Sequence, residues 1–168
     1  MIVVCPLSRL AETLAATRAR RVLSLLSEGA AAPRLDGIAP ADHLTLRFHD
    51  IVEPRDGHVP PGEAHVREAL EFASGPEPIV VHCYAGVSRS TAMAYAIACA
   101  REPARDEREL AAELRRASPM ATPNRLIISL ADDALGREGR MAAAIAAIGR
   151  GEDAFEGAPF TLHQAGAP

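Results

Sequence analysis

The sequence is poor in the features that mark several protein classes: its 168 residues include no tryptophan, two tyrosines and three cysteines. Cys5, Cys83 and Cys99 are too few for a disulfide framework, so we expect a reducing, cytoplasmic setting. The apolar run after Met1 is short and unlike a secretory signal, and no stretch approaches the length of a membrane span. The net charge of −4 gives no general attraction to nucleic acid or anionic lipid. We therefore expect neither nucleic acid nor membrane as a partner.

The composition that remains is ordinary for a soluble globular protein, with 48% hydrophobic and 24% charged residues. Strand-like segments alternate along the chain with segments of helical periodicity. The strands are expected at 2–4, 21–27, 43–48 and 79–82, and the helices at 8–20, 63–73, 91–100, 106–117, 122–136 and 137–149. This order predicts an α/β fold, a three-layer sandwich whose mainly parallel central sheet is flanked by helices.

The domain organisation follows from the same pattern. The length suits one domain, which we place at residues 1–149, and the Gly- and Pro-containing segment 150–168 is expected to be an irregular tail. In the helix over 122–136, Thr122 is expected to be the cap and Pro123 the first helical residue. Asp132 and Asp133 near its end are expected to be surface charges.

The segment VVHCYAGVSRSTAMAYA, residues 80–96, joins an apolar strand to an apolar helix through a turn of reactive residues. In an open α/β sheet, ligands bind where the strands end and the helices begin. The amides of such a turn form a concave nest, and the helix N-terminus adds positive potential. Arg89 contributes a planar fork that can hold two oxygens of one phosphate. The turn is therefore predicted to bind an anion.

The same surroundings change the expected chemistry of Cys83. A thiol beside a cation at a helix N-terminus is favoured in its thiolate form, which is a competent nucleophile. A nucleophile at the floor of a phosphate-binding turn indicates phosphoryl transfer through a cysteinyl-phosphate. A buried structural cysteine is the alternative, and it fits Cys5 and Cys99 better because both lie in apolar runs. A protective disulfide between Cys83 and either of them stays open at this point.

The segment HCYAGVSRS resembles the His-Cys-x5-Arg-Ser/Thr signature of the cysteine-dependent protein tyrosine and dual-specificity phosphatases. The resemblance extends to the acidic loop before the signature and to the PNR segment at 123–125, and so covers most of residues 1–136. The compact length is similar to the dual-specificity and bacterial branch rather than to the larger tyrosine-specific enzymes. This resemblance implies a metal-independent phosphomonoesterase without cofactors, acting on a phosphorylated protein or a small phosphoester.

The resemblance also implies a role for each residue of the turn. Cys83 would attack phosphorus, the Ser90 hydroxyl would hydrogen-bond its sulfur, and His82 would order the loop. The phosphate oxygens would be held by the Arg89 side chain and by the backbone amides of the loop, whose residues are Tyr84, Ala85, Gly86, Val87, Ser88 and Arg89.

The family takes the proton for its leaving group from an aspartate in a loop upstream of the signature. Asp50 stands 33 residues before Cys83, directly after a predicted strand, and Asp56 stands 27 residues before it. We favour Asp50 as the general acid and keep Asp56 as the alternative, because geometry decides which carboxyl reaches the leaving group. Asn124 lies where the family often has an asparagine, and a supporting role near the site is expected.

Other functions remain as alternatives. A catalytically silent phosphate-binding module would share the fold, although an intact Cys83 and Arg89 favour an enzyme. A phosphoinositide phosphatase is disfavoured because the loop contains no lysine, which relatives with such substrates tend to carry. A serine hydrolase built on Ser88 is a distant alternative, since Ser90 stands where a nucleophile elbow needs glycine. The scattered histidines show no metal-ligand spacing, and nothing indicates the oligomeric state.

Overall fold

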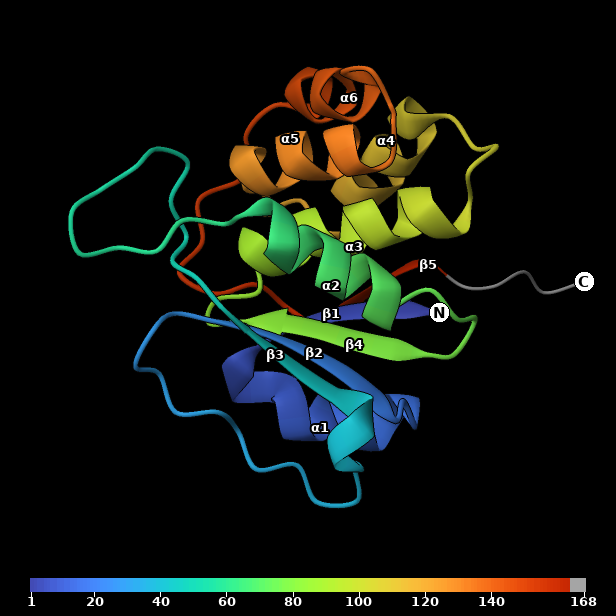
Figure 1. Ribbon diagram of the computed structural model, residues 1–168. Coiled ribbons are helices and arrows are strands. Elements are labelled where there is room, and N and C mark those ends of the chain that lie inside the picture. The colour runs from blue at the N-terminus through green and yellow to red at the C-terminus, as the bar shows by residue number, and fades with distance from the viewer. Residues whose placement is uncertain (164–168) are drawn as a thin grey trace, which may run out of the picture.

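A five-stranded sheet forms the middle of the molecule, with the strand order β3-β2-β4-β1-β5 (Figure 1). The computed structural model describes residues 1–163. The strands are β1 (Ile2–Pro6), β2 (Arg21–Leu26), β3 (His43–Arg47), β4 (Ile79–Cys83) and β5 (Phe160–His163). The first four are parallel to one another, and β5 pairs antiparallel with β1. The prediction of a mainly parallel sheet is confirmed.

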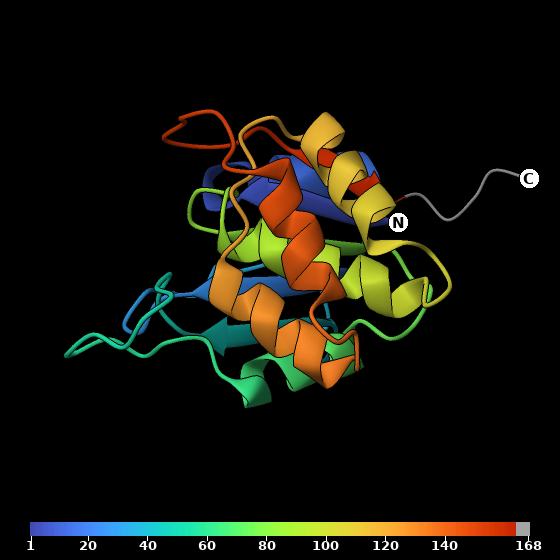
Figure 2. The ribbon, with the colours of Figure 1, turned by 90° about the horizontal axis from the view of Figure 1, so that it is seen from above.

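Helices cover both faces of this sheet, so the molecule has the three layers that the sequence predicted (Figure 1). One face carries α1 (Leu10–Thr17), together with the short 3-10 turns η1 (Leu7–Arg9) and η2 (Pro40–Asp42). The other carries α2 (Glu63–Phe72), α3 (Arg89–Arg101), α4 (Glu107–Ala117), α5 (Arg125–Ala134) and α6 (Arg140–Ile148). Seen from above, α4, α5 and α6 lie over α3 (Figure 2). Among the described helices, none has the length and apolarity needed to cross a membrane.

The alternation of side chains in the central strands explains the two apolar cores. In β1, Ile2 and Val4 pack into the larger core under α2–α6, while Val3 packs on the α1 side. Helix α3 is buried almost all round, from Arg89 to Cys99, because it lies between the sheet and the outer helices. A sequence that is apolar on every face suits this position. The site at its N-terminus is thus attached to the most completely packed helix of the chain.

The predicted irregular tail is wrong for residues 160–163, which form the edge strand β5. Leu162 is 1% exposed and belongs to the larger core. The burial of this leucine and the pairing with β1 stabilise the strand. Four residues are too few to show a clear alternation of apolar and polar side chains in the sequence. Residues 149–159 contain no helix or strand, as expected. The rest of the predicted tail, residues 164–168, lies outside the described part of the chain.

Two local expectations near α5 also need correction. The cap of α5 is Asn124 and not Thr122, because the Asn124 Oδ1 accepts from the amides of Leu126 at 3.0 Å and Ile127 at 3.1 Å. Asp132 is 2% exposed rather than a surface charge. Its carboxylate accepts hydrogen bonds from three amides at the start of α6, those of Gly139, Met141 and Ala142. The helix dipole stabilises a buried carboxylate in this position.

Replacing Leu162 by alanine should lower the free energy of unfolding by about 2–3 kcal/mol, because the loss of the leucine side chain leaves a cavity in the core. The partly exposed Thr161 on the same strand is the control, and Thr161→Ala should cost less than about 1 kcal/mol. Urea unfolding of both variants measures the difference. Equal and small effects would show that β5 does not contribute to the core.

Candidate active site

The loop of residues 83–89 connects β4 to α3 at the edge where the parallel strands end. Its Gly86 has a φ of 70°, and a Cβ there would lie 2.7 Å from the Pro6 nitrogen and 2.9 Å from the Cys5 carbonyl carbon. Only glycine combines this backbone conformation with so close an approach to β1. The loop therefore keeps its shape by lying directly against the backbone at the end of β1.

Three segments distant in sequence hold the carbonyls of the loop on its outer side. Leu7 N donates to the Tyr84 carbonyl at 3.1 Å, Gly157 N to that of Ala85 at 2.8 Å, and Thr122 N to that of Val87 at 3.0 Å. In a planar trans peptide the carbonyl and the next amide point in opposite directions, so these bonds turn the following amides toward the inside of the loop. The result is a concave set of donors, the arrangement that binds an anion.

Cys83 lies at the floor of this loop, with 2% of its surface exposed. Its Sγ is 3.3 Å from the Gly86 amide, which donates to it, and 3.2 Å from the Ser90 Oγ. The amide stabilises negative charge on the sulfur, and the hydroxyl can either donate to the sulfur or accept from the thiol. The sulfur therefore lies at the floor of the loop with an amide donor and a hydroxyl beside it.

Arg89 is buried next to the loop, with 5% exposure. Its Nη1 donates to the Phe48 carbonyl at 3.0 Å and to the Ser27 hydroxyl at 3.3 Å. Its Nε is buried and has no hydrogen-bond partner within the described residues. Within residues 1–163, no carboxylate forms an ion pair with Arg89. A buried cation normally has an anionic partner, so this one favours an anion supplied from outside the chain.

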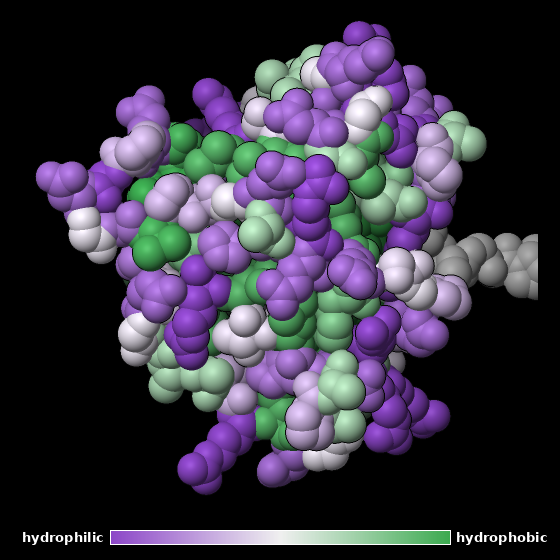
Figure 3. Space-filling view, viewed as in Figure 1, coloured by the Kyte–Doolittle hydropathy of each residue, from purple (hydrophilic) through white to green (hydrophobic). Residues whose placement is uncertain are grey.

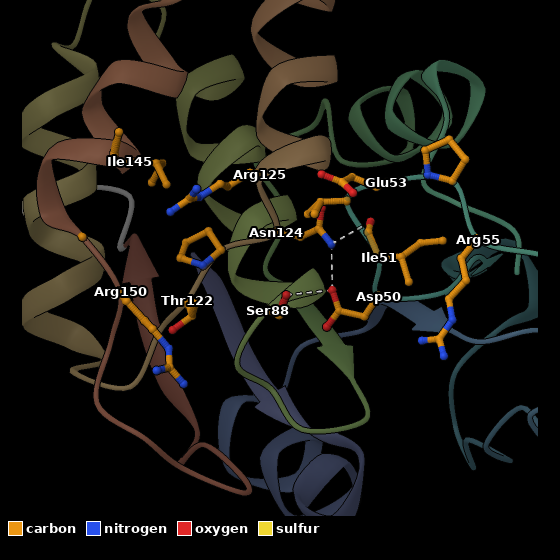
Figure 4. A pocket seen from close by; sticks show the side chains of 15 residues that line it. Asp50, Ile51, Glu53, Arg55, Ser88, Thr122, Asn124, Arg125, Ile145 and Arg150 are labelled. Carbon is orange, nitrogen blue, oxygen red and sulfur yellow. Dashed lines mark hydrogen bonds between the residues drawn. The ribbon is translucent and has the colours of Figure 1, made fainter.

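Asp50 is brought to the loop, and Asp56 is not. The Asp50 Oδ1 accepts from the Ser88 Oγ at 2.8 Å and from the Asn124 Nδ2 at 2.7 Å (Figure 4). Asn124 also donates to the Ile51 carbonyl at 3.3 Å, so its side chain supports the loop that carries Asp50. Asp56 stands six residues after Asp50 and is exposed. Its backbone carbonyl forms a hydrogen bond with the His58 ring. Of the two carboxyls, only that of Asp50 is hydrogen-bonded to the loop of residues 83–89.

A buried polar chain behind the loop was not anticipated from the sequence. The Ser24 Oγ lies 2.6 Å from the Nε2 of His82 and 2.8 Å from the Nε2 of His43. A hydroxyl has one proton, so it donates to one ring and accepts from the other. Ser24 is the one polar residue in the buried stretch 22–26 of β2, and this is the feature that could have identified it.

Burial is the main reason that the pKa of His82 falls from 6.5 to about 4, and the charges of His43 and Arg89 act in the same direction. The ring has no exposed surface, and its Nδ1 has no partner within the described chain. His82 is therefore neutral at physiological pH. It supports the loop through packing and Ser24 rather than as a charge.

The other two cysteines, Cys5 and Cys99, are free and buried like Cys83. Cys5 is on β1, with its side chain in the core on the α1 side, whereas Cys83 belongs to the core on the opposite face. Cys99 stands ten residues after Arg89 on α3, about 15 Å along the helix axis. Burial raises the pKa of the Cys5 thiol to about 11 and that of Cys99 to about 12. Cys83 forms no disulfide with either of them, and the Cys5 and Cys83 side chains point to opposite faces of the sheet.

The described residues contain no group of three or more histidines, cysteines and carboxylates arranged to hold a metal ion. What the loop offers instead is a set of inward amides, a guanidinium, a sulfur and a tethered carboxyl. These groups can bind a tetrahedral oxyanion, attack its central atom and transfer a proton.

The depressed pKa of His82 predicts a loss of stability in acid. Above pH 6.5 the ring is neutral in the native and the unfolded chain, but between pH 6.5 and 4 only the unfolded chain takes up the proton. Replacing His82 by glutamine removes this linkage, so the stability difference between wild type and His82→Gln should fall by about 3 kcal/mol from pH 7 to pH 4. Urea unfolding across this range measures it. A pH-independent difference would show that the pKa of His82 is the same in the native and the unfolded protein.

No protein-family model and no curated protein matches the sequence. Solved structures match the fold. DUSP15 superposes with a TM-score of 0.64 at 18% identity, over 88% of this chain and 89% of that chain. The Yvh1 phosphatase domain from Chaetomium thermophilum has a TM-score of 0.57 at 17% identity, over 83% and 93%. A mouse putative dual specificity phosphatase complexed with zinc tungstate has a TM-score of 0.54 at 20% identity, over 81% and 80%. The chain therefore has the α/β fold of the dual-specificity and tyrosine phosphatases, as the resemblance of its loop implied.

Proposed function

We propose that this protein is a metal-independent phosphomonoesterase, a protein tyrosine or dual-specificity phosphatase that acts through a cysteinyl-phosphate. The observation that carries the proposal is the placement of the Cys83 sulfur at the floor of a loop whose amides turn inward. Arg89 and Asp50 lie at the same loop. The neighbour that was solved with zinc tungstate supports it further, because tungstate is a tetrahedral oxyanion like phosphate.

In the first step the Cys83 thiolate attacks phosphorus, and the bond between phosphorus and the leaving oxygen breaks. The loop amides and the guanidinium of Arg89 hold the three equatorial oxygens and stabilise their charge in the transition state. Asp50, in its acid form, gives its proton to the leaving oxygen. The products of this step are the free alcohol or phenol and a phosphorylated Cys83.

In the second step water attacks phosphorus, the sulfur–phosphorus bond breaks, and the Asp50 carboxylate takes one proton of the water. Inorganic phosphate and the Cys83 thiolate are released. The Ser90 Oγ lies 3.2 Å from the sulfur and donates its hydrogen bond as negative charge returns there. This donor lowers the barrier for the departure of the thiolate.

The contacts of Asp50 define which of its oxygens acts. Ser88 and Asn124 both donate to Oδ1, so the transferable proton is carried by Oδ2. Because Ser88 belongs to the phosphate-binding loop, its hydrogen bond also holds the acid at a constant position relative to the bound phosphate. Such positioning is a large part of general acid catalysis.

The pocket rim favours a phosphorylated side chain of a protein as substrate. Tyr84 is 62% exposed next to the nucleophile, and an exposed aromatic ring at a rim offers a stacking surface to a substrate side chain. The loop interior contains no lysine, so the site lacks the point charges that would hold further phosphates of a phosphoinositide inside the loop itself.

Replacing Cys83 by serine should lower kcat for 4-nitrophenyl phosphate by at least about 10³-fold, because the cysteinyl-phosphate can no longer form. The assay is run in a chelator, and wild-type turnover there checks that no metal is needed. Binding of inorganic tungstate to the variant shows that the loop is intact. A folded wild-type protein that binds tungstate but does not turn over would instead be a silent phosphate-binding module.

Replacing Asp50 by asparagine should lower kcat/KM by roughly 10²-fold for phenyl phosphate, whose leaving group needs a proton. The loss should be much smaller for 2,4-dinitrophenyl phosphate, whose leaving group departs as the anion. Asp56→Asn is the matched control in the same loop, and it should leave both rates within about twofold. A larger loss in Asp56→Asn than in Asp50→Asn would reverse the assignment of the general acid.

A further inference from the structure

A pocket of about 680 Å³ has Asp50 and Ser88 in its lining (Figure 4). One wall is the segment 50–55, and the other is formed by residues 122–125 and by the C-terminal end of α6 with Gly149 and Arg150. The pocket shares the general acid and one residue of the loop with the catalytic site, but Cys83 does not line it. A substrate whose phosphate lies in the loop therefore has its neighbouring groups at this opening.

The charges in the pocket favour an anionic group. It contains three arginines, Arg55, Arg125 and Arg150, against the carboxylates of Asp50 and Glu53. The Asp50 carboxyl already accepts hydrogen bonds from Ser88 and Asn124. With three arginines against two carboxylates, the lining of the pocket has a formal excess of one positive charge.

Arg125 is the cation best placed to bind a ligand. It is the first residue of α5, so its backbone is held by the cap that Asn124 makes at 3.0 and 3.1 Å, and Asn124 also donates to Asp50. Within the described chain, no carboxylate forms an ion pair with its guanidinium. Arg150 pairs with Asp153 on the surface, and exposed pairs of this kind are weak enough to exchange for a ligand.

The remaining wall of the pocket is apolar, which favours a peptide over a highly polar ligand as the occupant of the pocket. Ile51, Val52, Pro54, Pro123, Ile145 and Ala146 line it. Figure 3 shows apolar surface open to solvent on this side, between the loop that precedes α2 and the helices next to it. Apolar walls with a few charged groups suit the side chains of a peptide, whereas a polyphosphorylated sugar would leave this surface unused.

We propose that this pocket binds an acidic side chain of the phosphoprotein substrate, close in sequence to the phosphorylated residue, through Arg125 with Arg150 beside it. This proposal rests on the proposed phosphatase activity and names the substrate class of the same site. A guanidinium binds a carboxylate through two parallel hydrogen bonds, so the contact depends on the orientation of the two groups as well as on their charge. Arg125 is thus a specificity-determining residue and not a catalytic one.

The test compares phosphopeptides that differ in one flanking residue, glutamate or glutamine, placed in turn at each position near a phosphotyrosine or a phosphothreonine. For the best position, wild type should favour the glutamate peptide by about five- to tenfold in kcat/KM. Arg125→Gln should bring this ratio close to one, and Arg125→Glu should favour a peptide with lysine there. Arg116→Gln removes a surface arginine of α4 outside this pocket, and it should keep the wild-type ratio.

Three results would overturn the proposal. The first is a wild-type enzyme that does not distinguish glutamate from glutamine at any position, and the second is an Arg125→Gln variant that keeps the full ratio. The third is a preference for an inositol polyphosphate over every peptide that disappears in Arg125→Gln. Hydrolysis of 4-nitrophenyl phosphate by wild type is measured in parallel. Turnover without discrimination contradicts only this inference, whereas absence of turnover contradicts the proposed function as well.

Discussion

The guanidinium of Arg89 lies where the ends of β2, β3 and β4 come together, and it is almost completely buried. Nη1 binds the carbonyl of Phe48, just after β3, and the hydroxyl of Ser27, just after β2. Burying a cation is unfavourable unless polar groups or an opposite charge surround it. Two neutral oxygens solvate one side of the group, and an anion in the loop would complete its surroundings. Binding of an anion there would thereby be coupled to the packing of the sheet against α3.

The loop depends equally on close contact with β1. Parallel pairing of β1 with β4 places Pro6 beside Cys83, and Gly86 lies against the same backbone. On its other edge β1 pairs with β5, and the segment that leads into β5 donates from Gly157 to the Ala85 carbonyl. The C-terminal segment therefore supports the sheet and the loop together. A tail that composition alone describes as irregular is part of the domain for this reason.

Elements with strong local patterns were predictable from the sequence. The buried strand at 79–83 and the apolar helix after Arg89 follow from runs of apolar residues between breaking residues. The strand at 160–163 was missed because four residues carry too little alternation, and its stability comes from pairing with β1. The cap of α5 was placed two residues early because Thr122 and Asn124 are both suitable caps. The segment is positioned by tertiary hydrogen bonds from the Thr122 amide to Val87 and from the Asn124 amide to Ser88, which the local sequence does not encode.

The sequence by itself determined the chemical character of the loop. His82, Cys83, Gly86, Arg89 and Ser90 lie within nine residues, and a turn from a strand to a helix imposes its geometry locally. Only the tertiary structure decided that Asp50 and not Asp56 meets this loop, that Ser24 links His82 to His43, and that Arg125 lines the same pocket as Asp50. Asp50 is 38 residues from Ser88 and 74 residues from Asn124 in the sequence. Ser24 and His82 are 58 residues apart. Their distances depend on how strands and helices pack, which no local periodicity encodes.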